Sequence, residues 1–270
     1  MNSLQRIALG VEYDGTDYYG WQIQAQSPTV QEVLQQALAQ VADHPIEVVC
    51  AGRTDTGVHG RCQVVHFDTR APRSERSWVL GANSNLPDTV AVRWAQQVPE
   101  SFHARFSARR RSYRYRLLNR WVRPGLGGRY LAWERRPLAL APMQAAATLL
   151  LGEHDFSAFR TVHCQAPSPV RTLYRLTITA NQDEFVFEAQ ANGFLHHMVR
   201  NLVGSLLVVG RGEQPPEWVA EVLRSGDRCQ AGPTAPSAGL CFLGPAYPLE
   251  WGLPPEVSLP EAGEGSCAPG

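Results

Sequence analysis

The stretch CAGRTDTGVHG, from Cys50 to Gly60, lies between two apolar runs at 46–49 and 63–67. An ordinary connection between two antiparallel strands needs only about two to five residues. This one contains an arginine, an aspartate, a histidine and three glycines. Reactive side chains tend to lie on loops that a rigid scaffold holds in place, so the loop is the first candidate for a functional site. The alternative is ordinary turn chemistry, in which Asp55 caps its own backbone and pairs with Arg53.

Hydrophobic periodicity on either side of the loop predicts alternating strands and helices. In the first half we expect strands at 6–13, 46–51, 62–68 and 89–96 and helices at 29–41 and 74–84. In the second half we expect strands at 112–119, 170–180, 184–192 and 240–243 and helices at 140–151, 194–209 and 215–225. The simplest architecture is α+β, with two halves that each form a sheet with helices on one face.

The predicted domains are residues 1–108, which carry the loop, and residues 109–251. Prolines, glycines and acidic residues dominate 252–270, so this segment is expected to be a disordered tail. The first ten residues resemble neither a secretory signal nor a transit peptide. The longest apolar stretch, 202–210, is too short to span a bilayer. We therefore expect a cytoplasmic protein with no membrane partner.

The six cysteines contain no CxxC pair and no regular spacing. This argues against a zinc ribbon, a redox pair or a disulfide framework in a chain of this length. His163 and Cys164 are adjacent, but no second pair lies at zinc-site spacing. The expectation is that the cysteines are reduced thiols and that the protein has no metal site.

Charge is distributed unevenly along a chain whose formal net charge is zero. All 25 basic residues are arginine, and eleven of them fall within 101–136, where Glu134 is the one acidic residue. That segment is therefore +10 and the remainder is −10, which predicts a positive face on a neutral molecule. Aromatic residues lie between these arginines, as stacking on unpaired bases requires. A solvated arginine-rich face is the alternative.

The stretch AGRTDTGVHG at 51–60, followed by QVVHF at 63–67, resembles the signature of the tRNA pseudouridine synthases of the TruA family. Further blocks resemble this family in the same order: EYDGTDYYGWQ at 12–22, NSNLP at 83–87, FHARFSA at 102–108, YRY at 113–115, LGEHDF at 151–156 and NGFLHHMVRNLVG at 192–204. The similarity covers roughly residues 5–245. One departure is Thr56, which stands where the family usually has alanine.

The resemblance implies an RNA-modifying isomerase that converts uridine to pseudouridine at positions 38–40, in the anticodon stem-loop of tRNA. It implies two ferredoxin-like halves that share a continuous, mainly antiparallel central sheet. It also implies a homodimer that binds tRNA and uses no cofactor. Two alternatives are a tRNA-binding protein or RNA chaperone without activity, and a hydrolase that uses Asp55 on a small substrate. The +10 segment would be unexplained by the hydrolase.

By the resemblance, Asp55 is the nucleophile, and it attacks either C1′ of the ribose or C6 of the uracil. Arg53 fills the gap that the flipped nucleotide leaves, and Arg200 pairs with Asp55. Tyr113 stacks on the target base and is also a catalytic candidate, for the deprotonation of C5. Leu240 is expected to line the uracil pocket. The expected tRNA contacts are Phe102, His103, Ala104, Arg105, Phe106, Arg109, Arg110, Arg111, His163, Cys164, Gln165, Ala166 and Pro167. Within the predicted helix at 194–209, neighbouring residues point in different directions. We therefore interpret His196 and His197 as structural, with at most one of them near the site.

Overall fold

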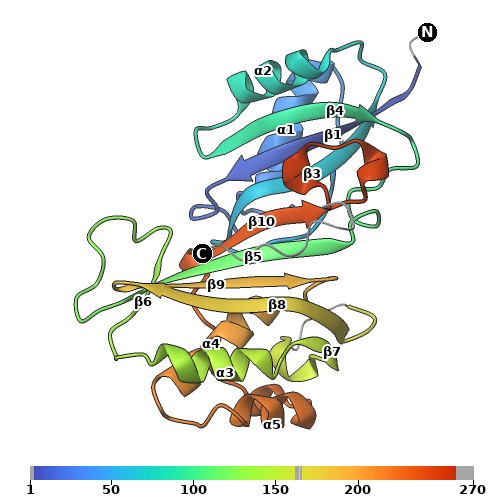
Figure 1. Cartoon of the computed structure of the whole chain (residues 1–270). Helices are drawn as coiled ribbons and strands as arrows, with labels where there is room; N and C mark the ends of the chain where they lie inside the picture. The colour runs from blue at the N-terminus through green and yellow to red at the C-terminus, as the bar shows by residue number, and fades with distance from the viewer. Residues whose placement is uncertain (1–2, 162–163, 165, 260–270) are drawn as a thin grey trace. The chain divides into compact units, whose positions relative to one another are not determined.

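The computed structural model describes residues 3–161, 164 and 166–259, and it divides into two compact units (Figure 1). The first unit contains residues 1–54, 60–110 and 243–270, and the second contains 55–59 and 111–242. The main division, after residue 110, lies close to the predicted boundary at 108. Two features differ from the prediction: the chain returns to the first unit at residue 243, and residues 55–59 belong to the second.

The first unit is built on three antiparallel strands in the order β4-β1-β3. Its elements are β1 (Gln5–Tyr13), α1 (Val30–Ala42), β2 (Val49–Cys50), β3 (His59–Thr69), α2 (Glu75–Asn85) and β4 (Val90–Val98). The short β2 pairs with the middle of β3. The last strand, β10 (Leu240–Ala246), contributes its residues from 243 onward to this unit.

Alternation along β1 gives the first unit two packed faces. Ile7, Leu9 and Val11 point toward α1 and α2, which lie on one side of these strands (Figure 1). Ala8 points to the other side and packs with residues of 98–108 and of 247–257. A polar outer face, which would be usual for an antiparallel sheet, is therefore replaced by a second core.

The second core includes residues that the sequence assigns to a disordered tail. Leu253 and Val257 are buried, and the backbone N–H of Tyr247 donates to the carbonyl of Val257 at 2.8 Å. For 252–259 the predicted disorder is therefore wrong, because Leu253 and Val257 are buried in the core that lies on this face of β1. Residues 260–270 lie outside the described part of the chain.

The second unit has the strand order β5-β9-β8-β7, with antiparallel pairing along this path. Its elements are β5 (Arg110–Asn119), β6 (Ala132–Glu134), α3 (Leu140–Thr148), β7 (Gly152–Asp155), β8 (Val170–Asn181), β9 (Glu184–Ala191), α4 (Met198–Gly210) and α5 (Trp218–Ser225). β6 is parallel to the end of β5, and the first half of β10 belongs to this unit. Short 3-10 turns of this unit lie at Ser157–Phe159, Arg228–Gln230 and Ser237–Gly239, and those at Leu249–Trp251 and Pro255–Val257 belong to the first unit.

Alternate residues of β5 point to opposite faces of its sheet. Tyr115 and Leu117 are buried in the core that α3 and α4 cover, on one side of the strands in Figure 1. On the other face, Arg114 pairs with Glu188 at 2.7 Å and Arg116 pairs with Glu184 at 2.5 Å. Carboxylates from β9 thus neutralise part of the +10 segment. The charge pattern of the sequence does not show this, because the paired residues are 74 and 68 positions apart.

The α+β class and the mainly antiparallel pairing are confirmed. Several boundaries differ: the strand expected at 46–51 is reduced to Val49–Cys50, the helix expected at 140–151 ends at Thr148, and the helix expected at 194–209 begins at Met198. The short strands β6 and β7 were not predicted, because three or four residues carry too little alternation to detect. Within the described ranges, every helix is too short or too polar to cross a membrane.

Candidate active site

Asp55 lies at the start of a tight turn in the second unit. The N–H of Val58 donates to the carbonyl of Asp55 at 3.1 Å, and the Val58 side chain is buried in the core of that unit. Gly57 has a φ of +74°, which a residue with a side chain rarely adopts, and an added Cβ would lie 2.7 Å from Ser237 Oγ. The turn therefore requires glycine, and it leaves the Asp55 side chain 22% exposed.

The residues just before Asp55 are held by the first unit. The Tyr13 hydroxyl and Thr54 Oγ1 are 2.8 Å apart, and the N–H of Trp21 donates to the Thr54 carbonyl at 3.0 Å. Arg53 is exposed, and so is Thr56, the residue that departs from the family pattern. An exposed hydroxyl at this position costs no burial of a polar group. The predicted role of Arg53 on the substrate stays a prediction.

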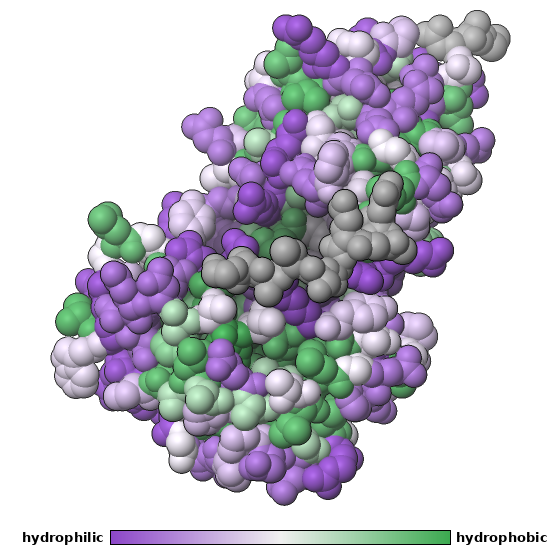
Figure 2. Space-filling model, viewed as in Figure 1, coloured by the Kyte–Doolittle hydropathy of each residue, from purple (hydrophilic) through white to green (hydrophobic). Residues whose placement is uncertain are grey.

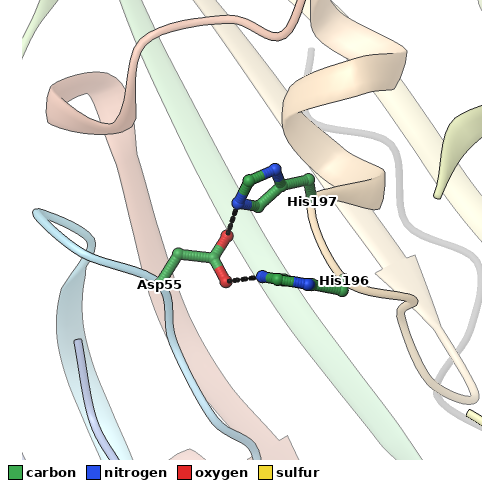
Figure 3. Close-up of side chains that lie close together, drawn as sticks. All are labelled: Asp55, His196 and His197. Atoms are coloured by element: carbon green, nitrogen blue, oxygen red, sulfur yellow. Dashed lines mark ion pairs between the residues drawn. The ribbon is translucent and has the colours of Figure 1, made fainter. Parts of the chain in front are cut away.

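Two consecutive histidines contact the Asp55 carboxylate (Figure 3). His196 Nε2 lies 3.2 Å from Oδ1, and His197 Nε2 lies 3.4 Å from Oδ2. Their ring centroids are 4.3 Å apart. Each oxygen of the carboxylate therefore has an imidazole partner of its own.

The expectation that at most one of the two histidines lies near the site is wrong, because the predicted helix at 194–209 includes both residues but the observed helix includes neither. Helix α4 begins only at Met198, and His197 precedes it with a φ of +62° and a ψ of 5°. This left-handed conformation is uncommon for a residue other than glycine, although Gln26, Asp43 and Gln182 also adopt it. The turn that it creates lets two neighbouring side chains reach the same carboxylate.

His196 has a second partner that holds its ring. Its Nδ1 lies 3.0 Å from Thr161 Oγ1, and the N–H of Thr161 donates to the His196 carbonyl at 3.2 Å. Thr161, His196 and Asp55 thus form a chain of polar contacts within the second unit. Thr161 is not predictable from the sequence, since no motif joins it to residues so distant along the chain.

Arg200, expected beside Asp55, has its Nη1 3.7 Å from Oδ2. Its Nε donates to the Ala235 carbonyl at 2.8 Å, which fixes the guanidinium. That carbonyl is placed by a close approach of the chain to α4 at Gly204, where an added Cβ would overlap the carbonyl oxygen of Pro233. The absence of a side chain at Gly204 therefore allows the chain to place the Ala235 carbonyl, which holds Arg200 beside the Asp55 carboxylate.

The electrostatics keep Asp55 ionised. Burial raises the pKa of its carboxyl, but the hydrogen bond from His196 and the positive charges of His197 and Arg200 outweigh burial, and the pKa lies below its ordinary value. The hydrogen bond to Asp55 raises the pKa of His196 above its ordinary value. Burial lowers the pKa of His197. The cluster at neutral pH is therefore a carboxylate with one permanent cation and one histidine that protonates readily.

Tyr113, on β5, belongs to an aromatic group beside the same short segment. Its ring centroid lies 5.1 Å from that of Phe194 and 4.9 Å from that of Phe242. Residues 194–197 thus contact the Tyr113 ring at one end and the Asp55 carboxylate at the other. Leu240 is only 4% exposed and is part of the core of the second unit. Its predicted place in a uracil pocket stays a prediction.

The segment expected to bind tRNA, 102–106, is mixed in its exposure. Phe102 and Ala104 are fully buried, with the Phe102 ring 5.2 Å from that of Tyr247 and 5.3 Å from that of Trp251. In this structure they present no surface to a ligand, and the prediction for these two residues is wrong. They are core residues because the returning chain covers them. Phe106 is 70% exposed, its ring is stacked on His103, and Arg105 lies over it at 5.6 Å.

The remaining expected contacts are placed as follows. Arg109 is exposed, Arg110 and Arg111 are half-buried, and Arg111 Nη1 donates to the Asn192 carbonyl at 2.9 Å. In the run 163–167, His163 and Gln165 lie outside the described residues. Cys164 and Ala166 are partly buried against the core of the second unit, and Pro167 is exposed. The cysteines at 50, 62, 164, 229 and 241 are free thiols, as expected.

Exposed apolar side chains gather on the loop that follows β5. Figure 2 shows apolar surface there in an otherwise largely hydrophilic region. The residues are Trp121, Val122, Leu126 and Tyr130. Asn119 to Trp121 and Arg135 to Pro137 line a pocket of about 630 Å³. This combination of arginine and tryptophan suits an unpaired base or a phosphate, and the loop lies within the basic segment at 101–136.

One feature of the site was not expected. Asp55, His196 and His197 place one oxygen and two nitrogen ligand atoms within 4.8 Å of one another. The sequence argument against a metal site depended on cysteine and histidine spacing. It could not detect a group assembled from a loop and a turn far apart in the chain.

Comparisons with known proteins agree with the motif. A family model described as tRNA pseudouridine synthase matches residues 10–107 and 146–248. A protein of Xanthomonas campestris named tRNA pseudouridine synthase A is 58% identical over 94% of this chain and 99% of its own length. Proteins with the same name from Xylella fastidiosa and Stenotrophomonas maltophilia are 57% and 58% identical, over 95% and 94% of this chain and the whole of their own lengths.

Proposed function

Since this chain belongs to the tRNA pseudouridine synthase family, we propose that it isomerises uridine to pseudouridine at positions 38–40 of tRNA, with Asp55 as the nucleophile. In this reaction the bond from C1′ to N1 breaks and a bond from C1′ to C5 forms. The proton leaves C5, and N1 gains one, so the atoms balance without an oxidant or a second substrate. An attack by Asp55 on C1′ or on C6 satisfies this balance equally.

The observation that carries the proposal is the state of the Asp55 carboxylate. A nucleophile must be unprotonated, and the surrounding cations hold the pKa of Asp55 below its ordinary value despite its burial. Arg200 and the two imidazoles supply this stabilisation at 3.2–3.7 Å. A tRNA-binding protein without activity would gain nothing from an ionised, half-buried carboxylate, so these contacts favour the enzyme.

The target uridine has to leave the helix stack before Asp55 can reach it, which costs a few kcal/mol and least near the end of a loop. We propose that Arg53, exposed on the same loop, occupies the vacated position in the stack. Tyr113, whose ring is held by Phe194 and Phe242, is proposed to stack on the everted base. The exposed side chains of Arg105 and Phe106 and the half-buried side chain of His103 are proposed to hold the tRNA backbone.

A tritium-release assay tests the activity. A tRNA transcript labelled at C5 of uridine should lose its label in the presence of the enzyme and without any cofactor. Asp55→Asn should bind the same transcript and release none. Undiminished release by that variant would remove Asp55 from its role. Binding without release by the wild-type protein would instead support the inactive tRNA-binding alternative.

The salt dependence of tRNA binding tests the basic segment. Each phosphate contact that is lost should reduce the slope of log K against log salt concentration by roughly 0.7–0.9. Arg109→Ala with Arg110→Ala should therefore flatten the slope. Arg114→Ala with Arg116→Ala is the matched control, because these two arginines already pair with Glu188 and Glu184. Equal slopes for both double variants would show that residues 109 and 110 are not part of the footprint.

We also propose that the enzyme is a cytoplasmic homodimer and that one tRNA contacts both subunits. The family resemblance supports this proposal. Light scattering of the purified protein, with and without one equivalent of tRNA, measures the number of chains in each species. A monomer that keeps full activity would contradict the proposed arrangement.

A further inference from the structure

We propose that Asp55, His196 and His197 form a binding site for Zn²⁺ or a similar divalent transition metal, and that the bound ion blocks the carboxylate. The metal would be an inhibitor that competes with the reaction, and it would have no part in catalysis. The blocking effect rests on the proposed function of Asp55, whereas the binding site itself does not.

The distances between the three ligand atoms suit a tetrahedral ion. With bonds of about 2.0–2.1 Å to nitrogen or oxygen, two ligands of a tetrahedral zinc ion lie about 3.3 Å apart. The two nitrogen-to-oxygen separations at Asp55 are 3.2 and 3.4 Å. The two separations involve different oxygens of the carboxylate, so the side chains must close around a shared ion, starting from ligand atoms that lie within 4.8 Å of one another.

The ligand types select the metal. Two imidazole nitrogens and one carboxylate favour Zn²⁺ and its neighbours in the first transition row, whereas Mg²⁺ and Ca²⁺ prefer sites built of oxygen. The ion would displace the proton that His196 holds toward Asp55 and release it to solvent. With three protein ligands, the fourth position stays open to water, as in zinc sites that are not purely structural.

The surroundings of the ligands are partly organised for a metal. Metal-bound histidines usually use their second ring nitrogen in a hydrogen bond that fixes the ring, and His196 Nδ1 contacts Thr161 Oγ1 at 3.0 Å. His197 is held by its left-handed backbone at the start of α4. The exposed fractions of the His196 and His197 side chains, 42% and 27%, leave a path for an ion.

Arg200 opposes the binding of a cation. Its Nη1 lies 3.7 Å from Oδ2, and its Nε is held by the Ala235 carbonyl, so the positive charge stays near the carboxylate. This repulsion predicts a modest affinity for Zn²⁺. It also predicts that substitutions at the histidines and at Arg200 change that affinity in opposite directions. Removal of a histidine should weaken Zn²⁺ binding, whereas Arg200→Met should strengthen it.

The first experiment measures Zn²⁺ binding without tRNA, by competition with a coloured chelator. The wild-type chain should bind one ion more tightly than His196→Ala or His197→Ala by more than about tenfold, since loss of even a second-shell partner costs that much. Thr161→Val should give an intermediate loss. His154→Gln, a change at a partly exposed histidine whose Nε2 contacts the Leu151 carbonyl at 2.8 Å, serves as the control for loss of any histidine. Circular dichroism of each variant checks that it is folded.

Cobalt substitution separates this site from the cysteines. Co²⁺ at Asp55, His196 and His197 should show tetrahedral visible absorption without the thiolate charge-transfer band that cysteine ligands add. A thiolate band, or equal affinity in the wild type and in the variant lacking both histidines, would overturn the proposed site.

Inhibition is tested separately, in the tritium-release assay. Micromolar Zn²⁺ should slow release, a chelator should restore it, and millimolar Mg²⁺ should not imitate it. Binding without inhibition would overturn the blocking effect alone. Absence of tritium release in every condition would instead contradict the proposed function and leave the binding result intact.

Discussion

Two histidine pairs, one in each unit, show opposite behaviour. In the first unit, the rings of His66 and His103 are 4.8 Å apart, and burial lowers the pKa of both, that of His66 to about 4. In the second unit, the rings of His196 and His197 are 4.3 Å apart, and although burial lowers the pKa of His197, the hydrogen bond to Asp55 raises the pKa of His196. Proximity of two imidazoles therefore does not decide their charge.

The difference in pKa between His66 and His196 comes from the groups that contact each ring. His66 is 4% exposed, its Nδ1 accepts the N–H of Ala104 at 3.1 Å, and Arg6 and His103 repel a proton more strongly than Asp68 attracts one. His196 donates instead to the carboxylate of Asp55. The first pair is a packing element that stays neutral, and the second is an electrostatic support for an anion.

The largest effect is expected when the second pair is made to resemble the first. Asp55→Asn removes the charge that raises the pKa of His196, so that pKa should fall below its ordinary value, and turnover should fall by at least about 10⁴-fold if Asp55 is the nucleophile. NMR titration of the histidine ring protons measures the first change, and tritium release measures the second. Asp68→Asn is the matched control in the first unit, where the carboxylate pairs with Arg6 at 2.7 Å. A pKa of His196 that stays raised in Asp55→Asn would contradict this explanation.

The next effect concerns the scaffold of the second pair. Gly204→Ala places a methyl group on the Pro233 carbonyl, so helix α4 or the segment that carries Ala235 must move. Such overpacking should lower the free energy of unfolding by about 3 kcal/mol and loosen Arg200 from Asp55. Urea unfolding measures the loss. Gly125→Ala is the control, since its added Cβ meets no atom within 4 Å. Equal stability of the two variants would show that the close approach at Gly204 is not tight.

Much of this architecture is predictable because its signals are local. Alternation in β1, β5 and β9 depends on residues within a few positions of one another, and so does the N-cap of α1, where the Thr29 side chain accepts the N–H of Glu32. Asp55 was identified by its motif, and Arg200 was expected beside it by family resemblance. For those two residues the structure adds the distance and the carbonyl that holds the guanidinium.

The features that were missed depend on contacts that local patterns do not carry. A left-handed residue at His197 ends the helical periodicity without any change in residue type, so the sequence alone extends the helix through both histidines. Thr161 reaches His196 only through the fold. The burial of Phe102 depends on Tyr247 and Trp251, which return from the end of the chain. The two histidine pairs differ through such contacts: Thr161 holds His196, whereas the buried Phe102 packs against His66.

A smaller effect is expected from the first pair as the pH falls. The neutral His66 contributes stability that is fully present above the pKa of an unfolded histidine and is lost as the pH falls toward its folded pKa of about 4. Between pH 7.5 and pH 5 this loss amounts to about 2 kcal/mol. His66→Asn keeps an acceptor for Ala104 but cannot titrate, so its free energy of unfolding should fall less over that range, although it starts lower. Urea unfolding at both pH values measures the difference, with His154→Gln as control. Parallel pH profiles for His66→Asn and the wild type would place the acid sensitivity elsewhere.

The smallest predicted effect distinguishes the contribution of the backbone conformation to stability from that of the side chain, at His197 and at His66. His197 occupies a left-handed conformation, which costs a residue with a Cβ roughly 1–2 kcal/mol, whereas His66 lies in strand β3. His197→Gly should therefore be more stable than His197→Ala by about 1 kcal/mol, although both lose an imidazole from Asp55 and should be equally slow. At His66 the order should reverse, because glycine weakens a strand by about 0.5–1 kcal/mol relative to alanine. Urea unfolding of the four variants measures both signs. If glycine were the less stable choice at both positions, the backbone at His197 would not be strained, and the joint contact of the two histidines with Asp55 would need another explanation.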